Sequence, residues 1–483
     1  MILKSKYVIP VNIEPIEDGA IFIEGDTIKD VGYAKDIEIK YPNEEIKDLG
    51  LAALMPGLVN THTHIAFSAL RGLFEDMPYV EWKRACLAVE PLMERSDWIN
   101  SARLGTLESI ASGITTVADF SRSAESFDAI RDSKMRSIMY VGTSTMHQKY
   151  ANEVVQNTLK TIDDLSNESH EDLINFGIGA GHTYACHPEV YSAIADAVEG
   201  TDMRVAMHLA CCQEETDFVK YGSSPLSIHA SKITQGLKLD EFGYFPWLPS
   251  GTTPVRYVYN WRLLQLPNVL VIHGVHVDDD DISFLAKSKA AISFCPRINA
   301  KLGMGLTPVS KYLEAGITVG LGTDSPAAVT MTDMIAEMRF GLMLTRARDG
   351  SSSNCYMTGD TMLKMATIKA AKALGLDDKI GSLEIGKKAD IIAIDLHNSH
   401  QVPTSDPAGA VIYTANQDNV MMTMINGEIL YDSFTFKPEF NRSDVIKEAS
   451  ALRKRLRKEM TDDELIKSRM KSYTRDLSER FKR

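Results

Sequence analysis

Histidines and one aspartate recur along the chain with the spacing of a metal site. His62 and His64 stand two residues apart at the end of the apolar run GLVNTHTH, residues 57–64. Residues two apart in an extended segment point to the same side, so both imidazoles can face one cation. Four further polar residues end or directly follow other apolar runs: His182, His208, His273 and Asp324. Each alone could be a buried, hydrogen-bonded polar residue, but together they predict one metal centre.

The elements that must position these residues are short apolar runs rich in β-branched side chains, separated by segments with helical spacing. This alternation is typical of a parallel sheet. Eight strands spread over about 300 residues predict an α/β fold, a (β/α)₈ barrel with its chemistry at the carboxyl ends of the strands. A doubly wound open sheet is the alternative. The expected strands are 57–62, 114–119, 136–141, 176–181, 204–208, 269–273, 290–295 and 317–322.

The two chain ends differ from this pattern. Residues 1–56 have the character of hairpins, with a turn at Glu24-Gly25-Asp26 and no helix between the strands. Short strands and turns return within 380–435. We therefore expect the two ends to form one composite β-sandwich domain beside a metal-binding barrel at 57–379.

The C-terminal segment, 442–483, has a basic composition and apolar residues at helical spacing. We expect an amphipathic helix or two lying on the barrel or on a neighbouring subunit, with a membrane-surface helix as the alternative. The apolar residues of this pattern are Leu452, Leu456, Ile466, Met470, Tyr473, Leu477 and Phe481.

Composition excludes several classes of protein. Of the 483 residues, 44% are hydrophobic and 24% are charged, as in a globular protein rather than a disordered or fibrous one. The net charge of −13 disfavours nucleic acid as a partner. No stretch is long and apolar enough for a membrane span. Six cysteines without a CxxC pair favour free thiols and a cytoplasmic location.

Three motifs carry a resemblance to a known family. They are PGLVNTHTH at 56–64, LEAGITVGLGTDSP at 313–326 and KIGSLEIGKKADIIAID at 379–395. The chain resembles the metal-dependent amidohydrolase superfamily, in particular the branch of methylthioadenosine/S-adenosylhomocysteine deaminases, s-triazine chlorohydrolases and guanine-type deaminases. The likeness covers about residues 1–435.

The resemblance implies roles for the strand-end residues. His62, His64, His208 and Asp324 would hold one divalent metal ion, with zinc as the first expectation and iron as the alternative. Such an ion lowers the pKa of a bound water towards about 7. Asp324 would accept the proton of that water, His273 would hold the water or polarise the substrate, and His182 would bind the substrate.

One position departs from the family pattern. The family's fifth-strand motif is HxxE, whose glutamate carries protons to the leaving group, but this chain has His208-Leu209-Ala210-Cys211. A thiol is a different proton donor from a carboxylic acid. Glu214 or Glu215 could restore the acid, the leaving group could depart unprotonated, or Cys211 could act directly or bind a second metal with Cys212. Cys211 could also be an inert thiol that fills the space of the glutamate.

Substrate contacts are less well specified by the sequence. Asn299 remains in a seventh-strand motif that otherwise differs from the family's HNPxSN, and Glu90 resembles a ribose-binding glutamate although a helix-surface role is equally consistent. Arg71 stands in a familiar stretch where a structural role is expected. The aromatic-rich segment 221–261 could be a lid over a flat heterocycle, or it could pack helices or contact a subunit.

These observations predict a metal-dependent hydrolase that attacks a nitrogen heterocycle, such as an adenosine-type purine or an s-triazine. A deaminase is the first expectation. A hydrolytic dechlorinase with a good leaving group is the alternative, because of Cys211. A non-catalytic scaffold is the remaining one, and the four intact ligand positions argue against it. The expected partners are a small heterocyclic substrate and further copies of the chain, in a homodimer or homotetramer, with no nucleic acid and no membrane.

Overall fold

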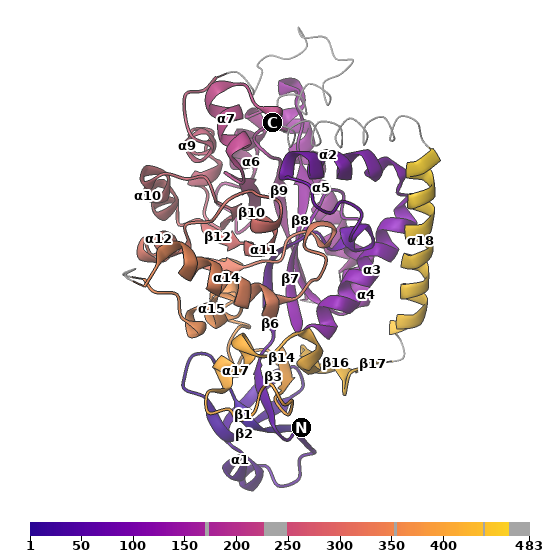
Figure 1. The fold of residues 1–483 in the computed structure, drawn as a ribbon, viewed down its shortest axis with the longest axis vertical. Coiled ribbons are helices and arrows are strands. Elements are labelled where there is room, and N and C mark those ends of the chain that lie inside the picture. The colour runs from indigo at the N-terminus through magenta and orange to yellow at the C-terminus, as the bar shows by residue number, and fades with distance from the viewer. Residues whose placement is uncertain (170–172, 227–248, 352–354, 438–439, 463–483) are drawn as a thin grey trace.

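The computed structural model describes residues 1–169, 173–226, 249–351, 355–437 and 440–462. Its centre is an eight-stranded parallel barrel with the strands in sequence order (Figure 1). The bridge between Thr63 and Asp324 and the bond from the backbone N–H of Asp324 to the carbonyl of His62 (2.9 Å) join the first strand to the segment after the last. The strands are β6 (Leu58–Thr63), β7 (Ile114–Ser121), β8 (Arg136–Thr143), β9 (Ile174–Ala180), β10 (Arg204–Leu209), β11 (Val269–His273), β12 (Ala291–Phe294) and β13 (Val319–Leu321).

Helices surround the barrel because its strands are apolar on both faces and need cover on the outside. The structure confirms the predicted α/β barrel and all eight predicted strands. The helices of this region are α2 (Tyr79–Val89), α3 (Arg95–Ala111), α4 (Phe127–Asp132), α5 (Ala151–Glu168), α6 (Glu189–Val198), α7 (Gln213–Tyr221), α9 (Pro254–Asn260), α10 (Asp279–Ser288), α11 (Pro296–Lys301), α12 (Val309–Glu314), α13 (Pro326–Val329), α14 (Met334–Asp349), α15 (Gly359–Met365) and α16 (Ile368–Ala373), with the 3₁₀ turns η1 (Ile65–Leu70), η2 (Glu90–Leu92), η3 (Gln148–Tyr150) and η5 (Leu263–Gln265).

Both chain ends contribute to a second sheet of nine strands, which lies at the opposite end of the molecule from α2 and α7 (Figure 1). The N-terminal part supplies β1 (Ile2–Val8), β2 (Ile16–Glu24), β3 (Thr27–Tyr33), β4 (Ile46–Asp48) and β5 (Ala52–Pro56). The C-terminal part supplies β14 (Ile391–Asp395), β15 (Val420–Ile425), β16 (Glu428–Asp432) and β17 (Thr435–Phe436), with α17 (Pro407–Tyr413) and η6 (Gln417–Asn419) between its strands. The composite character predicted for the small domain is therefore present, while its exact boundaries stay a prediction.

The two parts of this sheet meet at β5 and β14, which pair antiparallel, and again at their turns. A Cβ on Gly427 would stand 2.1 Å from the carbonyl oxygen of Gly25, and Gly427 has a φ of +78°. Only glycine fits such a close approach in that backbone conformation. The turn after β2 is thus fixed against the turn after β15.

Two details of the N-terminal region differ from expectation. A helix, α1 (Ala34–Lys40), follows β3 where the sequence analysis expects no helix. The sheet is also mixed, since β4 and β5 both pair parallel with β1. The sequence AKDIEIK has an alternating pattern that also suits a strand, and only Ala34 and Ile37 of the helix are buried.

The barrel and the small sheet are joined by a buried ion pair. The Arg136 guanidinium at the start of β8 donates to both carboxylate oxygens of Asp390 at 2.7 and 2.9 Å. Both side chains are 2% exposed. A bidentate pair of this kind fixes orientation as well as distance, so it sets how the sheet sits under the amino ends of the strands.

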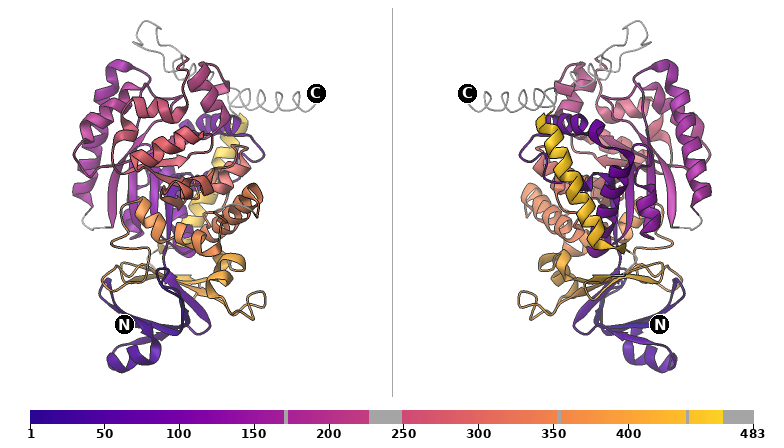
Figure 2. Two further views of the ribbon diagram at one scale, coloured as in Figure 1. Left: turned by 90° about the vertical axis from the view of Figure 1, so that its left-hand side faces the viewer. Right: turned by 90° about the vertical axis from the view of Figure 1, so that its right-hand side faces the viewer.

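The C-terminal helix α18 (Arg442–Asp462) packs along α3 and η1 on the outside of the barrel (Figure 2). Leu452 and Leu456 are buried there, as the amphipathic pattern predicts. The Arg453 guanidinium donates to the carbonyl of Arg71 at 2.8 Å, and Arg71 pairs with Glu108, which agrees with a structural role for Arg71. The predicted positions Ile466, Met470, Tyr473, Leu477 and Phe481 lie outside the described residues.

The aromatic-rich segment 221–261 is described only at its ends. Tyr257 and Tyr259 belong to α9, which packs against α7, α10 and η5, and Trp261 directly follows α9. These three side chains therefore serve helix packing. The remaining predicted lid aromatics, Tyr244, Phe245 and Trp247, lie outside the described residues. Within the described part of the chain, no helix has the length and apolar character of a membrane span.

Candidate active site

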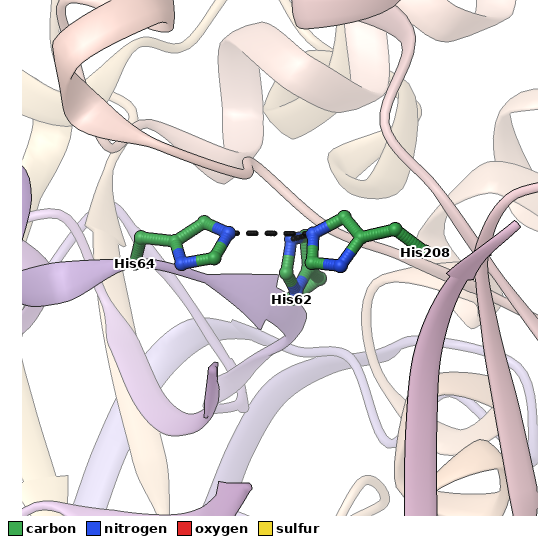
Figure 3. Close-up of side chains that lie close together, drawn as sticks. All are labelled: His62, His64 and His208. Carbon is green, nitrogen blue, oxygen red and sulfur yellow. Dashed lines mark hydrogen bonds between the residues drawn. The ribbon is translucent and has the colours of Figure 1, made fainter. Parts of the chain in front are cut away.

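Five side chains from four strands converge at the carboxyl end of the barrel (Figure 3 shows three of them). His62 and His64 come from β6 and the residue after it, His208 from β10, His273 from the end of β11, and Asp324 from the turn after β13. Because parallel strands end at the same rim, the polar residue that closes each apolar run reaches a common centre. The polar residues that end the apolar runs of the sequence therefore lie together in the structure.

The backbone is strained where two of these residues leave their strands. His273 has a φ of 76° and Asp324 a φ of 63°. Positive φ is uncommon for residues other than glycine, and such strain concentrates at functional sites. This backbone conformation turns the side chains of His273 and Asp324 towards the centre of the rim. There the His273 Nε2 lies 3.3 Å from the Asp324 Oδ2.

The spacing of four donor atoms suits one small cation. The Nε2 atoms of His62 and His208 lie 3.1 Å apart, and those of His64 and His208 lie 3.3 Å apart. The Asp324 Oδ1 lies 3.4 Å from the His62 Nε2 and 3.7 Å from the His64 Nε2. A tetrahedral ion with bonds of about 2.0–2.1 Å holds its ligand atoms about 3.3–3.4 Å apart. The donor set therefore fits a divalent metal of the zinc type.

The protonation states required of metal ligands are favoured by the surroundings. Burial lowers the pKa of His64 to about 3 and that of His273 to about 4, and it holds the pKa of His208 well below 6.5. Burial opposes ionisation of Asp324, yet the imidazoles of His62, His273 and His64 keep the pKa of its carboxyl well below the ordinary range. Neutral imidazoles and an ionised carboxylate are the forms that bind a cation.

Hydrogen bonds fix which imidazole nitrogen faces the centre. The Nδ1–H of His64 donates to the carbonyl of Phe120 at 2.8 Å, which leaves its Nε2 free for the cluster. The Nδ1–H of His273 donates to the Oδ1 of Asn299 at 2.9 Å. Asn299 in turn donates to Thr307 at 3.1 Å. These bonds hold the His64 and His273 rings with their Nε2 atoms towards the cluster.

We expect these shifts to make the metal-free protein sensitive to acid. The folded pKa values of His64 and His273 lie below the ordinary 6.5, so the unfolded chain binds more protons between about pH 4 and 6.5. Above pH 6.5 the free energy of unfolding keeps the full contribution of these two histidines. Below pH 6.5 it decreases as the pH falls, by up to about 1.4 kcal/mol per pH unit for each histidine. Urea unfolding at several pH values measures this slope, and His273→Gln should reduce it. An equal slope in both proteins would contradict the expectation.

A cavity of about 730 Å³ opens onto the metal site. His64, His208 and Ser325 line its inner end, while α2 contributes Trp82 and Lys83 to its wall. His182 also lines the cavity, with its ring centroid 4.6 Å from that of His208 and 4.8 Å from that of Tyr184. His182 therefore lies in the cavity wall beside the metal-site histidines, and its contact with a substrate stays a prediction.

Glu90, a second predicted substrate contact, also lines this cavity. Its side chain is only 12% exposed, and both carboxylate oxygens accept hydrogen bonds from the Arg122 guanidinium. Glu90 therefore lies in the cavity wall and not on an exposed helix surface. Arg122, Lys83 and Tyr184 also line the cavity, and none of these three residues was predicted from the sequence.

Asn299, the third predicted substrate contact, is placed elsewhere. It is 1% exposed and lies behind His273, which it orients, and it is not among the residues that line the cavity. The reason is its place on α11, the helix that begins directly after β12 and turns this amide into the core. In this structure Asn299 contacts a catalytic candidate rather than the cavity.

Cys211 is fully buried and does not line the cavity. Burial raises the pKa of its thiol well above the ordinary value, and its Sγ lies 3.7 Å from that of Cys212. The Glu215 carboxylate is also buried, where it accepts bonds from the Cys211 N–H (2.8 Å) and the Thr183 hydroxyl (2.7 Å). In this conformation Glu215 anchors the turn after β10, and none of Cys211, Glu214 and Glu215 contacts the cavity.

Comparison with known proteins agrees with this geometry. The sequence model of the amidohydrolase family matches residues 53–430 of this chain. The chain belongs to the amidohydrolase family. A 5-methylthioadenosine/S-adenosylhomocysteine deaminase of Moorella thermoacetica is 30% identical over 432 residues, which cover 89% of this chain and 94% of the relative. The enzyme of that name from Pyrococcus furiosus is 28% identical, with coverage of 89% and 94%.

Solved structures show the same fold as this amidohydrolase. A zinc-bound adenosine deaminase from Xanthomonas campestris superposes with a TM-score of 0.80 at 22% identity, covering 95% of this chain and 98% of that one. An atrazine chlorohydrolase variant from Arthrobacter aurescens, complexed with zinc and atraton, gives 0.79 at 23% identity, with coverage of 94% and 99%. The predicted family, fold and enzyme class are confirmed: this amidohydrolase is a metal-dependent hydrolase.

Proposed function

We propose that this amidohydrolase removes the amino group of an adenosine-type purine nucleoside by hydrolysis. The observation that carries the proposal is the convergence of His62, His64, His208 and Asp324 beside a cavity of about 730 Å³. Eight curated relatives, whose matches cover 78–90% of this chain, bear the name 5-methylthioadenosine/S-adenosylhomocysteine deaminase.

The metal held by these residues is proposed to be a single zinc ion, with iron as the alternative. A bound divalent cation lowers the pKa of its water towards about 7, which supplies hydroxide at neutral pH. Asp324 is ionised and belongs to the donor set through its Oδ1, so its other carboxylate oxygen, Oδ2, would accept the proton of the attacking water. His273 lies 3.3 Å from Asp324 on the same side and is held by Asn299, so it orients the water or the substrate.

The remainder of the cavity supports a purine nucleoside. His182 lines the cavity and stacks on the buried ring of Tyr184 with 4.8 Å between the ring centroids, so its imidazole is held where a flat heterocycle can contact it. Glu90, fixed by Arg122, presents a carboxylate that can accept hydrogen bonds from sugar hydroxyls. We assign His182 to the base and Glu90 to the sugar.

Hydrolytic dechlorination of a triazine-like ring is the second candidate. The observation that favours it is that none of Cys211, Glu214 and Glu215 lines the cavity. They therefore do not supply the carboxylic acid that the HxxE pattern provides. Chloride departs without a proton, so that acid would be dispensable.

Ammonia release by the zinc-loaded protein distinguishes the two candidates. We expect release from methylthioadenosine, S-adenosylhomocysteine or adenosine and little from melamine or ammeline. Guanine and cytosine serve as further amino-substituted bases without a sugar, and atrazine tests chloride release. Chloride release without any ammonia would replace the proposal by its alternative, and a metal-loaded protein inactive on every compound would contradict both.

A further inference from the structure

A lysine without a partner stands in the wall of the active-site cavity. Lys83 lies on α2 and lines the same cavity as His64, His208 and Ser325. Over the described residues, no hydrogen bond or ion pair engages its ammonium group. The neighbouring charged groups are occupied, since Glu90 pairs with Arg122 and Glu125 accepts from the backbone N–H of Ser123 at 2.8 Å. Among the described residues, Lys83 is thus a charged group of this wall that no protein partner engages.

The electrostatic surroundings of Lys83 favour loss of its proton. Burial lowers its pKa, and the nearby Arg122 guanidinium lowers it further, while Glu90, Cys86 and Asp324 act in the opposite direction. Lys83 in turn lowers the pKa of His64 and of His273, so its charge is felt across the metal site. An ammonium whose pKa is lowered is a better proton donor than an ordinary lysine.

The chemistry of amine departure requires such a donor. An amine leaves a ring carbon as neutral ammonia only after it gains a proton. Cys211 and Glu215 do not reach the cavity, and burial holds the pKa of the Tyr184 phenol well above 10. Glu90 is bound by Arg122 at both oxygens. Of these groups, the ammonium of Lys83 has both the position and a proton to give.

We propose that Lys83 is the general acid that protonates the departing nitrogen, a role that rests on the deaminase function proposed above. The oxygen of the attacking water forms the new C–O bond while one of its protons passes to the Asp324 carboxylate. The Lys83 ammonium gives a proton to the amino group, the C–N bond breaks, and its electron pair leaves with ammonia.

The second proton of the water moves from the new hydroxyl to the neighbouring ring nitrogen. The neutral Lys83 amine then takes up the proton held by Asp324. Both protons of the water are thereby accounted for, one in ammonia and one on the ring, and both side chains return to their starting states.

The test compares two leaving groups on one purine nucleoside, with adenosine as the amine and 6-chloropurine riboside as the chloride. Lys83→Met should lower kcat for ammonia release by about 10²- to 10⁴-fold and kcat for chloride release by less than about tenfold, because chloride departs without a proton. Lys83→Arg keeps the charge but holds its proton too tightly, so it should resemble Lys83→Met. Lys287→Met, at an exposed lysine outside the cavity, is the matched control and should match the wild type.

The pH profile and the metal content give further readouts. In the wild type, kcat for ammonia release should fall at high pH as the ammonium of Lys83 loses its proton, and this limb should disappear in Lys83→Arg. The groups that interact electrostatically with Lys83 are Arg122, Glu90, Cys86, Asp324, His64 and His273. Zinc content and unfolding temperature should stay at wild-type values in both lysine variants.

Four results would overturn the assignment. Equal losses for ammonia and chloride would show that Lys83 only shapes the cavity, and full activity of Lys83→Arg would show that only its charge matters. Wild-type rates in Lys83→Met would exclude any role, while the wild type's own ammonia release would still support the proposed function. A zinc-loaded wild type that releases no ammonia from any compound would overturn the proposed function, and this assignment with it.

Discussion

Asp324→Asn is expected to lower kcat by about 10²- to 10⁴-fold, the usual contribution of a positioned general base. The physical reason is that an amide cannot accept the proton of the attacking water, whereas the Asp324 carboxylate is ionised because His62, His273 and His64 hold its pKa low. Asparagine tolerates the positive φ of 63° at this position, so the fold should survive. Steady-state rates of ammonia release, normalised to bound zinc, measure the effect.

Asp333→Asn is a matched control for this change. Asp333 is also buried, and its carboxylate caps the start of α14 by accepting from the backbone N–H groups of Ile335 and Ala336. Asparagine caps helices as well as aspartate does, so this variant should keep wild-type activity. Activity within tenfold of the wild type in a zinc-loaded Asp324→Asn protein would contradict the role of Asp324 as the base.

His208→Ala is expected to reduce zinc affinity by more than about 100-fold. That figure is the upper end of the loss seen when a residue that only hydrogen-bonds to a metal ligand is replaced. His208 is the donor closest to both other histidines of the cluster, at 3.1 Å from His62 and 3.3 Å from His64. Its loss leaves two imidazoles and one carboxylate, and turnover should fall with the metal. Zinc bound per chain after dialysis against a weak chelator measures the effect.

His182→Ala separates metal binding from substrate binding. Its ring lies only 4.6 Å from that of His208 but takes no part in the donor cluster. The variant should keep its zinc and lose affinity for substrate, seen as a higher KM. Loss of zinc in His182→Ala, or its retention in His208→Ala, would show that the donor set has been assigned wrongly.

The barrel and the residues at its rim could be predicted from sequence because one physical rule governs both. A parallel strand buried on both faces is a continuous apolar run, and the polar residue that ends it must reach the rim. His208 ends RVAMH and His273 ends VLVIH, so their meeting followed from the order of the strands. The helix α1 was not predicted because most of it, DIEIK at 36–40, alternates between polar and apolar residues as a strand does.

The cavity wall could not be predicted in the same way. Whether Lys83 faces the cavity depends on how α2 lies across the strand ends, which helical periodicity does not specify. The burial of Cys211 follows from the turn after β10, where Glu215 accepts the Cys211 N–H. Asn299 was expected to contact substrate and instead orients His273, because α11 begins directly after β12. Each case depends on a loop or helix placement rather than on a local pattern.

We expect hydrolysis to depend on one metal ion held by His62, His64, His208 and Asp324. The most direct test of this claim is to titrate metal-free protein with zinc while measuring ammonia release from methylthioadenosine. We predict that the rate rises linearly and reaches a plateau at about one zinc per chain, and that His208→Ala shows no such rise. Ammonia release by the metal-free protein, or a rise that is unchanged in His208→Ala, would contradict the claim.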